Sequence, residues 1–278
     1  MTMPSKAPKE FLAIAGSLST RELSRQFVQT EDVIRRWRSQ AGIKAPATAV
    51  RDFEFPVINL DTFILTSDWH VPYHDIALVR DVIRCAVDNG IKDIVAAGDV
   101  IDFPTISRFD PRDVDSYVGM EFTAVGDVLY EFGEAGLQVH WTRGNHELRY
   151  FKALKHQVDI RDLVKSCIGD DDFITSYDVE EMVVLSGDDA WLITHPSDYS
   201  TVQLTVPKKL AEKYMMNVAS AHSHMYAFGH SPSGLELLET GGLFDPNKLA
   251  YLWRGGATKF PKQVSGWWCI DEGKVVMP

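Results

Sequence analysis

The sequence predicts an α/β catalytic domain preceded by a small all-helical domain. Two observations support this fold class. From residue 57 to residue 278, short apolar runs of strand length alternate with helical or loop segments, whereas residues 1–43 show helical spacing and helix-capping residues. Residues 44–56, which include Pro46 and Pro56, have no periodicity and are predicted to form a linker. We therefore expect a helical domain at 1–43, a linker at 44–56 and a catalytic domain at 57–278.

The first 43 residues are expected to fold into short helices joined by tight turns. Residues 9–16 are apolar, and Ser19 and Glu22 have the spacing of a capping box at the start of a helix over residues 20–27. Thr30 occupies the N-cap position of another helix over residues 31–39, and Gly42 ends it. Two short helices joined by a brief turn predict a helix-turn-helix unit.

The second of these helices carries arginines that could bind DNA or RNA. Arg35, Arg36 and Arg38 would each add a salt-dependent contact to a phosphate. Two features weaken this interpretation: Glu31 lies at the helix start, where base contacts normally arise, and Val28 replaces the turn glycine common in this motif. A protein-interaction or oligomerisation unit is the alternative.

The catalytic domain is expected to contain at least six strands and one clear helix. The helix covers residues 76–88 and begins after Asp75, which is a favourable N-cap residue. The predicted strands cover residues 62–67, 93–97, 137–142, 182–186, 190–194 and 217–221. Further β structure is expected at residues 235–240, 250–253 and 265–270.

Charge and composition limit the classes of protein that fit. The net charge of −11 is uneven: residues 1–50 contain eight Lys or Arg and four Asp or Glu, and the remainder contains 20 and 35. Carboxylates that bind cations are neutralised, so the acidic body does not exclude a polyanionic substrate. Cys85, Cys167 and Cys269 lie far apart and are expected to be buried, reduced thiols. Neither a bilayer-spanning run nor a signal-peptide pattern is present, so we expect a cytoplasmic protein without a membrane partner.

Five of the predicted strands end directly in a polar motif. Strand ends of one sheet lie along a common edge, so ligands that are distant in sequence can meet there on a rigid scaffold. Five of the nine histidines belong to these motifs, which chance placement does not explain. The motifs, in chain order, are Asp68-x-His70, Asp99-x-x-Asp102, Asn145-His146-Glu147, His195 and His222-x-His224.

The residue types in these motifs are those of a divalent metal site. Carboxylate, amide and imidazole ligands without a thiolate suit Mn²⁺, with Fe, Co, Ni or Zn as alternatives. The i,i+2 spacing in two of the motifs places both side chains on one side of an extended backbone. Two cations joined by a bridging carboxylate activate a water and hold a phosphoryl group for in-line attack. Hydrolysis of a phosphoester is the reaction that such a site favours.

The ordered series D-x-H, GD-x-x-D, GNHE, H and H-x-H resembles the calcineurin-like metallophosphoesterase superfamily over about residues 62–224. The resemblance implies a sandwich of two mixed β-sheets flanked by helices, with the cations at the strand ends. It assigns one metal to Asp68, His70 and His224, and the other to Asn145, His195 and His222, with Asp99 bridging them. It also implies that His146 protonates the leaving oxygen and that Asp102 orients and charges that imidazole. Glu147 is expected to brace its loop.

Differences between this sequence and the family pattern limit the activities that are expected. The last motif begins Ala221-His-Ser-His instead of Gly-His-Thr-His, which changes backbone freedom more than ligation. Asp102 is followed by Phe103 and not by the Arg-Gly of the Ser/Thr protein phosphatases, so protein phosphatase activity is not expected. Arg143 and Arg149 could give bidentate phosphate contacts, and surface ion pairing is the alternative.

The function expected from the sequence is binuclear, metal-dependent hydrolysis of a phosphomonoester or phosphodiester. The basic helical head favours nucleic acids or nucleotides as substrates. A phosphatase of a small metabolite or of a cyclic nucleotide is the enzymatic alternative. The alternative of another class is a DNA-binding regulatory or scaffold protein with a structural metal site, although such a site needs no general acid.

Overall fold

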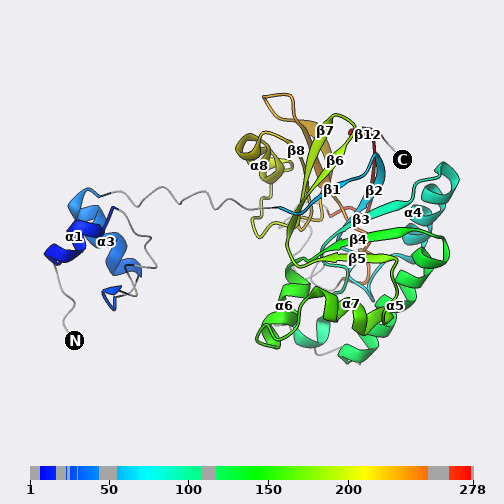
Figure 1. The fold of residues 1–278 in the computed structure, drawn as a ribbon, viewed down its shortest axis with the longest axis horizontal. Helices are drawn as coiled ribbons and strands as arrows, with labels where there is room; N and C mark the ends of the chain where they lie inside the picture. The colour runs from blue at the N-terminus through cyan, green and yellow to red at the C-terminus, as the bar shows by residue number, and fades with distance from the viewer. Residues whose placement is uncertain are drawn as a thin grey trace. The chain divides into compact units, whose positions relative to one another are not determined.

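The computed structural model describes residues 7–16, 23, 26–29, 31–43, 55–107, 117–249 and 263–276. The chain divides into two compact units, residues 1–54 and residues 55–278 (Figure 1). The division falls inside the segment that the sequence predicts to be a linker. Among the described residues, no helix combines the length and the apolar character needed to cross a membrane.

The N-terminal unit is held together by aromatic side chains. Helices α1 (Lys9–Ile14) and α3 (Glu31–Ala41) contribute Phe11 and Trp37, whose rings meet edge to face at 5.2 Å. Phe27 packs against both rings. The helix predicted over residues 20–27 lies largely outside the described residues, as do Ser19 and Thr30.

The second unit contains two mixed six-stranded sheets. The first sheet has the order β1-β6-β7-β8-β10-β9, and the second has the order β12-β11-β2-β3-β4-β5. The strands of the first sheet are β1 (Val57–Asn59), β6 (Glu181–Ser186), β7 (Asp189–Thr194), β8 (Asn217–Ser220), β9 (Tyr226–His230) and β10 (Glu236–Thr240). Those of the second are β2 (Thr62–Thr66), β3 (Asp93–Ala97), β4 (Gln138–Thr142), β5 (Ile174–Tyr177), β11 (Trp268–Asp271) and β12 (Lys274–Val276).

Helices flank the two sheets, as Figure 1 shows. Helices α4 to α7 lie beside the second sheet, and α8 packs on β8 and β10 of the first. Asp75 caps α4 by accepting hydrogen bonds from the amides of Ala77 and Leu78, as its sequence position predicts. The helices are α4 (Ile76–Asn89), the short 3₁₀ helix η1 (Pro104–Ile106), α5 (Val118–Glu134), α6 (Asn145–Ala153), α7 (Ile160–Ile168) and α8 (Thr205–Tyr214).

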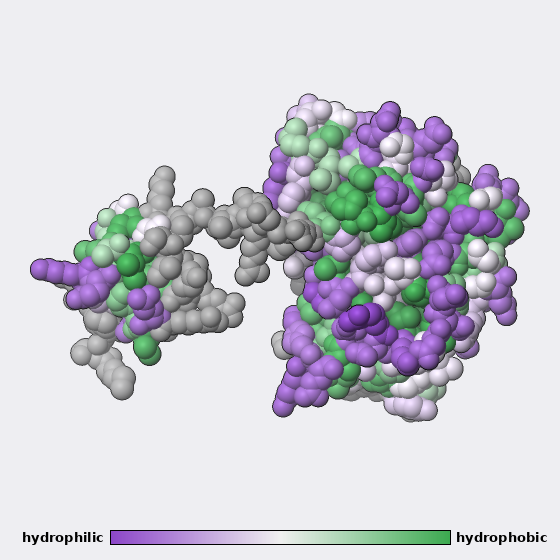
Figure 2. All heavy atoms as spheres, viewed as in Figure 1, coloured by the Kyte–Doolittle hydropathy of each residue, from purple (hydrophilic) through white to green (hydrophobic). Residues whose placement is uncertain are grey.

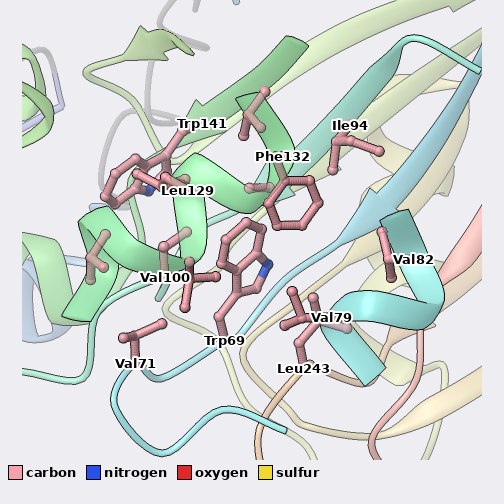
Figure 3. Packing of buried hydrophobic residues seen from close by; sticks show 14 of the residues in the cluster. Trp69, Val71, Val79, Val82, Ile94, Val100, Leu129, Phe132, Trp141 and Leu243 are labelled. Carbon is pink, nitrogen blue, oxygen red and sulfur yellow. The ribbon is translucent and has the colours of Figure 1, made fainter. Parts of the chain in front are cut away.

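The central parallel strands β2, β3 and β4 of the second sheet are buried on both faces, which explains their near-continuous apolar runs. Phe63 and Leu65 of β2 join a core with residues of the first sheet, including Trp191. Ile64, which lies between them on β2 and points to the opposite face, belongs to the core between the sheet and the helices. In that core Trp69 stacks on Phe132, with ring centroids 5.2 Å apart (Figure 3). The strand ends that carry the polar motifs are therefore fixed from both sides.

The fold class predicted for the catalytic domain, a sandwich of two mixed sheets flanked by helices, is confirmed. All six predicted strands occur, with ends shifted by about one residue, a normal uncertainty for such boundaries. Strand β11 begins at Trp268, later than residue 265, because Gly266 instead forms an isolated bridge with Gly242. The β structure expected at residues 250–253 lies outside the described residues.

Candidate metal centre

The polar motifs meet at one edge of the sandwich. Strands β2, β3 and β4 run parallel in one sheet, and β7 and β8 run parallel in the other. The residues after their carboxyl ends bring together side chains that are separated by more than 150 positions in the sequence. Within the described part of the chain, three groups have geometry that could hold a metal ion: Asp68, His70 and His224; His70, Asp99 and His146; Asp99, His195 and His222.

The first group surrounds a single carboxylate oxygen. Asp68 Oδ1 lies 3.1 Å from His224 Nε2 and 3.7 Å from His70 Nε2. The two Nε2 atoms lie 3.0 Å apart. Asp68 Oδ1 is buried without a hydrogen-bond partner among the residues that the structure describes. A buried carboxylate oxygen beside two converging imidazole nitrogens fits a divalent cation, which would satisfy all three atoms.

Asp99, His195 and His222 form another group, which shares Asp99 with the group of His70 and His146. Asp99 Oδ2 lies 3.2 Å from His195 Nε2, and His222 has a ring nitrogen within reach of both. Asn145 completes the set, because its Oδ1 lies 3.1 Å from His195 Nε2. Asp99 also belongs to the group with His70, so its carboxylate stands between the two ligand sets. Every ligand residue predicted from the sequence is thus part of one cluster.

Hydrogen bonds that Nδ1 donates to oxygen atoms orient three of the candidate ligand imidazoles. Nδ1 of His70 lies 2.7 Å from Asp102 Oδ1, and Nδ1 of His195 lies 2.9 Å from the carbonyl oxygen of Ala97. Nδ1 of His224 lies 3.1 Å from Gln263 Oε1. A proton held on Nδ1 leaves Nε2 as the ligand atom, which is the usual arrangement of partners around a metal-binding histidine.

The backbone at the ligands is held in an uncommon conformation. Non-glycine residues with positive φ are rare, cost about 1–3 kcal/mol each and concentrate at functional sites. Five of the seven predicted metal ligands have positive φ: Asp68 (46°), His70 (51°), Asp99 (51°), His222 (73°) and His224 (55°). Such repeated strain indicates that the ligand loops are shaped for their contacts and not for local stability.

Two motif glycines permit a close approach between ligand loops. A Cβ on Gly144 would lie 2.2 Å from Asp99 Oδ1, and a Cβ on Gly98 would lie 2.7 Å from His195 Nδ1. Gly98 also has a φ of +75°. These positions therefore require glycine for space. Ala221, by contrast, stands where the family pattern has glycine, is 2% exposed and is not among the residues with positive φ, so its methyl group is accommodated.

The electrostatics of the site favour positive charge beside the two buried aspartates. Burial raises the pKa of Asp68, but the His224 and His195 imidazoles hold it well below its ordinary value. Burial alone would lower the pKa of His70, but the hydrogen bond with Asp102 and the nearby carboxylates of Asp68 and Asp99 raise it to about 10. The pKa of His195 is likewise raised to about 10, because Asp99 and Asp68 outweigh its burial. A divalent cation supplies the same positive charge at the same place.

The geometry around His146 differs in detail from the interpretation of the sequence. His146 Nδ1 lies 2.5 Å from the main-chain oxygen of Asp102 and 3.4 Å from its carboxylate Oδ1. The carboxylate is closer to His70, because Asp102 Oδ1 points to the Nδ1 of that ring. Burial lowers the pKa of His146 to about 4, against the opposing charges of Asp99 and Asp102. Asp102 thus orients His146 through its backbone, and its side chain contacts His70, a candidate metal ligand.

Glu147 braces the loop, in the role expected from the sequence. Its fully buried carboxylate accepts hydrogen bonds from the main-chain amides of Gly144 (2.7 Å), Asp99 (3.0 Å), Val100 (2.9 Å) and Ile101 (3.3 Å). Burial and the charge of Asp99 raise the pKa of Glu147 to about 7. The carboxylate therefore ties the loop after β3 to the start of α6.

The two candidate phosphate-binding arginines have different surroundings. Arg143 Nε lies 3.0 Å from Glu180 Oε1 and its Nη1 lies 2.8 Å from Asp178 Oδ1, which is the ion-pairing alternative. Arg149 Nη1 donates to the main-chain oxygen of Asp102 at 3.3 Å, beside His146. Arg149 is therefore the better placed of the two to reach a substrate.

The arginines of α3 differ in their exposure to solvent. Arg38 is 4% exposed, and its Nε donates to the carbonyl oxygen of Ala15 at 2.9 Å, so its guanidinium supports the packing of the helices. Arg36 is exposed. The side chain of Arg35 lies outside the described residues. Of the three, Arg36 is the residue that the structure shows at the surface.

Some residues of the site carried no signal in the sequence. Gln263 orients His224, and Ser67 and Thr240 form hydrogen bonds that end on Asp68. Ser67 lies next to a motif, so its position could have indicated a role. Thr240 and Gln263 are distant in sequence from their partners, and only the folded chain brings them to the site.

A sandwich of two mixed sheets with carboxylates and imidazoles clustered at the strand ends is the architecture of a metal-dependent hydrolase. The chain matches a family model described as calcineurin-like phosphoesterase over residues 62–256, and it belongs to that family. The family resemblance inferred from the motifs is therefore confirmed. No curated protein sequence matches the chain significantly.

Several solved structures are similar to this chain. An archaeal phosphodiesterase is 15% identical, with 77% of this chain and 97% of that chain covered and a TM-score of 0.41. A dimetal phosphatase from Danio rerio is 13% identical, with coverage of 76% and 92% and a TM-score of 0.39. Vps29 from Chaetomium thermophilum is 12% identical, with coverage of 76% and 81% and a TM-score of 0.41.

Proposed function

We propose that this protein is a binuclear phosphoesterase whose two cations are bound by two ligand sets that share Asp99. The observation that carries the proposal is the presence of Asp99 in two metal-competent groups, one with His70 and His146 and the other with His195 and His222. Asp68, His70 and His224 form one set, and Asn145, His195 and His222 form the other. Held by these residues, two cations would supply Lewis-acid polarisation of the phosphoryl group and a lowered pKa of the attacking water. Mn²⁺ is the first choice for these oxygen and nitrogen ligands.

His146 is the residue proposed to handle the proton of the leaving group. Its ring is oriented from Nδ1 by the main-chain oxygen of Asp102, which directs Nε2 toward the cluster, 3.7 Å from Asp99 Oδ2. A bound phosphoester brings negative charge next to this imidazole and favours its protonated form. Transfer of the proton from Nε2 to the leaving oxygen avoids the release of an alkoxide. Arg149, on the same helix, is proposed to bind a phosphate oxygen.

Nucleic acids or nucleotides are the proposed substrates. Residues 1–50 contain eight basic and four acidic residues, and this basic segment precedes the hydrolytic unit in the sequence. An exposed cation such as Arg36 adds a salt-dependent contact to a phosphate. A full-length chain with Arg36→Glu should bind single- or double-stranded DNA or RNA more weakly, with a smaller salt dependence. Arg84→Glu, at an exposed position of α4, is the matched control. Binding that is absent or independent of salt in the wild type contradicts the nucleic-acid proposal.

The activity itself is tested with Mn²⁺-loaded protein on bis-p-nitrophenyl phosphate and p-nitrophenyl phosphate. We expect turnover that is lost after treatment with a chelator and restored by Mn²⁺. A panel of single- and double-stranded DNA, RNA, cyclic nucleotides and linear nucleotides then ranks the natural substrate classes by kcat/KM. Metal-loaded protein that is inert toward every phosphoester would instead favour a regulatory or scaffold protein with a structural metal site.

A further inference from the structure

The hydroxyl groups of Ser67 and Thr240 form a buried chain that ends on Asp68. Ser67 Oγ lies 2.6 Å from Asp68 Oδ2 and 2.6 Å from Thr240 Oγ1. Ser67 follows β2 directly, whereas Thr240 is the last residue of β10 in the other sheet. Ser67 and Asp68 are 0% exposed and Thr240 is 1% exposed, so solvent does not compete for these bonds. This chain of hydrogen bonds therefore connects the two sheets at the site.

The number of hydroxyl protons determines which group donates in each hydrogen bond of this chain. A carboxylate that binds a cation is ionised and can only accept hydrogen bonds. Ser67 therefore gives its single proton to Asp68 Oδ2, and Thr240 must give its own proton to Ser67 Oγ. Thr240 Oγ1 also lies 3.3 Å from the carbonyl oxygen of Ser220, which is the longer of its two contacts. The donors point toward the aspartate along the whole chain.

These bonds separate the roles of the two oxygens of Asp68. Oδ2 is within hydrogen-bond distance of Ser67 Oγ at 2.6 Å and of the main-chain amide of His222 at 3.2 Å. Oδ1 has no hydrogen-bond partner among the described residues and faces His224 Nε2 at 3.1 Å. A carboxylate fixed by two donors on one oxygen cannot rotate to offer both oxygens to a cation. Only Oδ1 is left to coordinate.

We propose that Ser67 and Thr240 are positioning residues that hold Asp68 as a one-oxygen ligand and thereby set the metal affinity of the Asp68–His70–His224 set. This proposal rests on the proposed function, because it takes Asp68 as a metal ligand. It extends that function to two residues that bind neither metal nor substrate. Loss of such an outer partner typically weakens metal binding by about 10- to 100-fold.

Four substitutions separate positioning from packing. Ser67→Ala removes the hydroxyl next to Asp68. Thr240→Val removes the second hydroxyl at nearly constant volume, whereas Thr240→Ser retains it. Ser186→Ala is the matched control, because Ser186 is also a buried serine: it donates to the carbonyl oxygen of Asp61 at 2.7 Å and accepts from the amide of Gly273 at 2.8 Å. Ser186 lies at the end of β6 away from His195, since it pairs with Asp189 and not with Thr194.

The test titrates the metal-free full-length chain with Mn²⁺ and follows the unbound ion by its electron paramagnetic resonance signal. We expect Ser67→Ala to weaken binding of one ion by about 10-fold or more. Thr240→Val should weaken it in the same direction, and Thr240→Ser and Ser186→Ala should bind like the wild type. Thermal melting of the metal-free variants shows whether each is folded. If Ser67→Ala fails to fold, the comparison of Thr240→Val with Thr240→Ser decides.

Two results overturn the proposal. One is wild-type Mn²⁺ affinity in both Ser67→Ala and Thr240→Val. The other is equal weakening in Thr240→Val and Thr240→Ser, which would assign the effect to packing. Asp68→Ala, which removes both oxygens, distinguishes this failure from a failure of the proposed function. If Asp68→Ala binds as many Mn²⁺ ions as the wild type, the metal-ligand role of Asp68 is wrong and both proposals fail. If it loses an ion while the hydroxyl variants bind normally, only the positioning proposal fails.

Discussion

The carboxylate of Asp102 is hydrogen-bonded to His70. Asp102 Oδ1 lies 2.7 Å from His70 Nδ1, whereas His146 Nδ1 is bonded to the main-chain oxygen of Asp102 at 2.5 Å. One residue therefore orients a proposed metal ligand with its side chain and the proposed general acid with its backbone. A substitution of the side chain can separate these two effects, because it leaves the backbone carbonyl in place.

Asp102→Asn should weaken Mn²⁺ binding more than it alters proton transfer. The asparagine oxygen can still accept from His70 Nδ1, but it lacks the charge that makes His70 a stronger ligand, so we expect about 10-fold weaker Mn²⁺ binding. At saturating Mn²⁺, the dependence of kcat on the leaving group should match the wild type. Unchanged metal affinity together with an altered leaving-group dependence would instead assign the carboxylate to His146.

His146→Gln should retain both cations and lose turnover selectively. We expect kcat to fall by about 10²- to 10⁴-fold on phenyl phosphate, which has a poor leaving group that needs a proton. On p-nitrophenyl phosphate, whose leaving group departs as a stable anion, the loss should be much smaller. His156→Gln, at an exposed histidine after α6, is the matched control. Equal losses on the two esters would contradict a role in protonation.

Arg149 and Arg143 should respond differently to the same change. Arg149→Gln is expected to raise KM about tenfold without loss of metal, because it removes one charged contact to the phosphate. Arg143→Gln should leave KM unchanged and reduce the free energy of unfolding by about 1 kcal/mol, since Arg143 is paired with Glu180 and Asp178. Steady-state kinetics and urea unfolding measure the two effects. A larger rise in KM for Arg143→Gln would reverse the assignment.

Glu147→Gln should destabilise the fold by about 3 kcal/mol. The carboxylate accepts from the main-chain amides of four residues, and the NH₂ group of glutamine would point a donor at some of these donors. Glu131→Gln, which removes a solvent-exposed pair with Arg80, is the control and should cost at most about 1 kcal/mol. Urea unfolding of the metal-free proteins gives both values. Similar losses in the two variants would show that the buried carboxylate is not a brace.

The strands that carry the site could be predicted from the sequence because each is a short apolar run followed at once by a polar motif. Helix α4 could also be predicted, from its apolar spacing and the capping residue Asp75, but helices α5, α6 and α7 could not. Helix α5 contains Gly126 in a helical interior, where glycine is normally unfavourable. The structure gives the reason: a Cβ at Gly126 would lie 2.5 Å from the carbonyl oxygen of Cys167 in α7. A close approach between two helices is a tertiary feature with no local signature.

That the candidate ligands lie together could be predicted for a similar reason, but the side chains that orient these candidate ligands could not be predicted. Asp68 and His70 belong to a compact motif, whereas Thr240 reaches Ser67 across 173 positions of sequence. The assignment of the Asp102 carboxylate also depended on side-chain direction, which spacing does not encode. Phe103 has a φ of +53° and turns the chain directly after Asp102, next to the carbonyl group that His146 contacts.

Anomalous diffraction from crystals soaked in Mn²⁺ is the most direct test of the proposal that two cations share Asp99. Data collected near the manganese absorption edge should show two peaks roughly 3.5–4 Å apart. One peak should lie among Asp68, His70 and His224, the other among Asn145, His195 and His222, with oxygens of Asp99 contacting both. A single peak, or peaks that Asp99 does not bridge, would contradict the account.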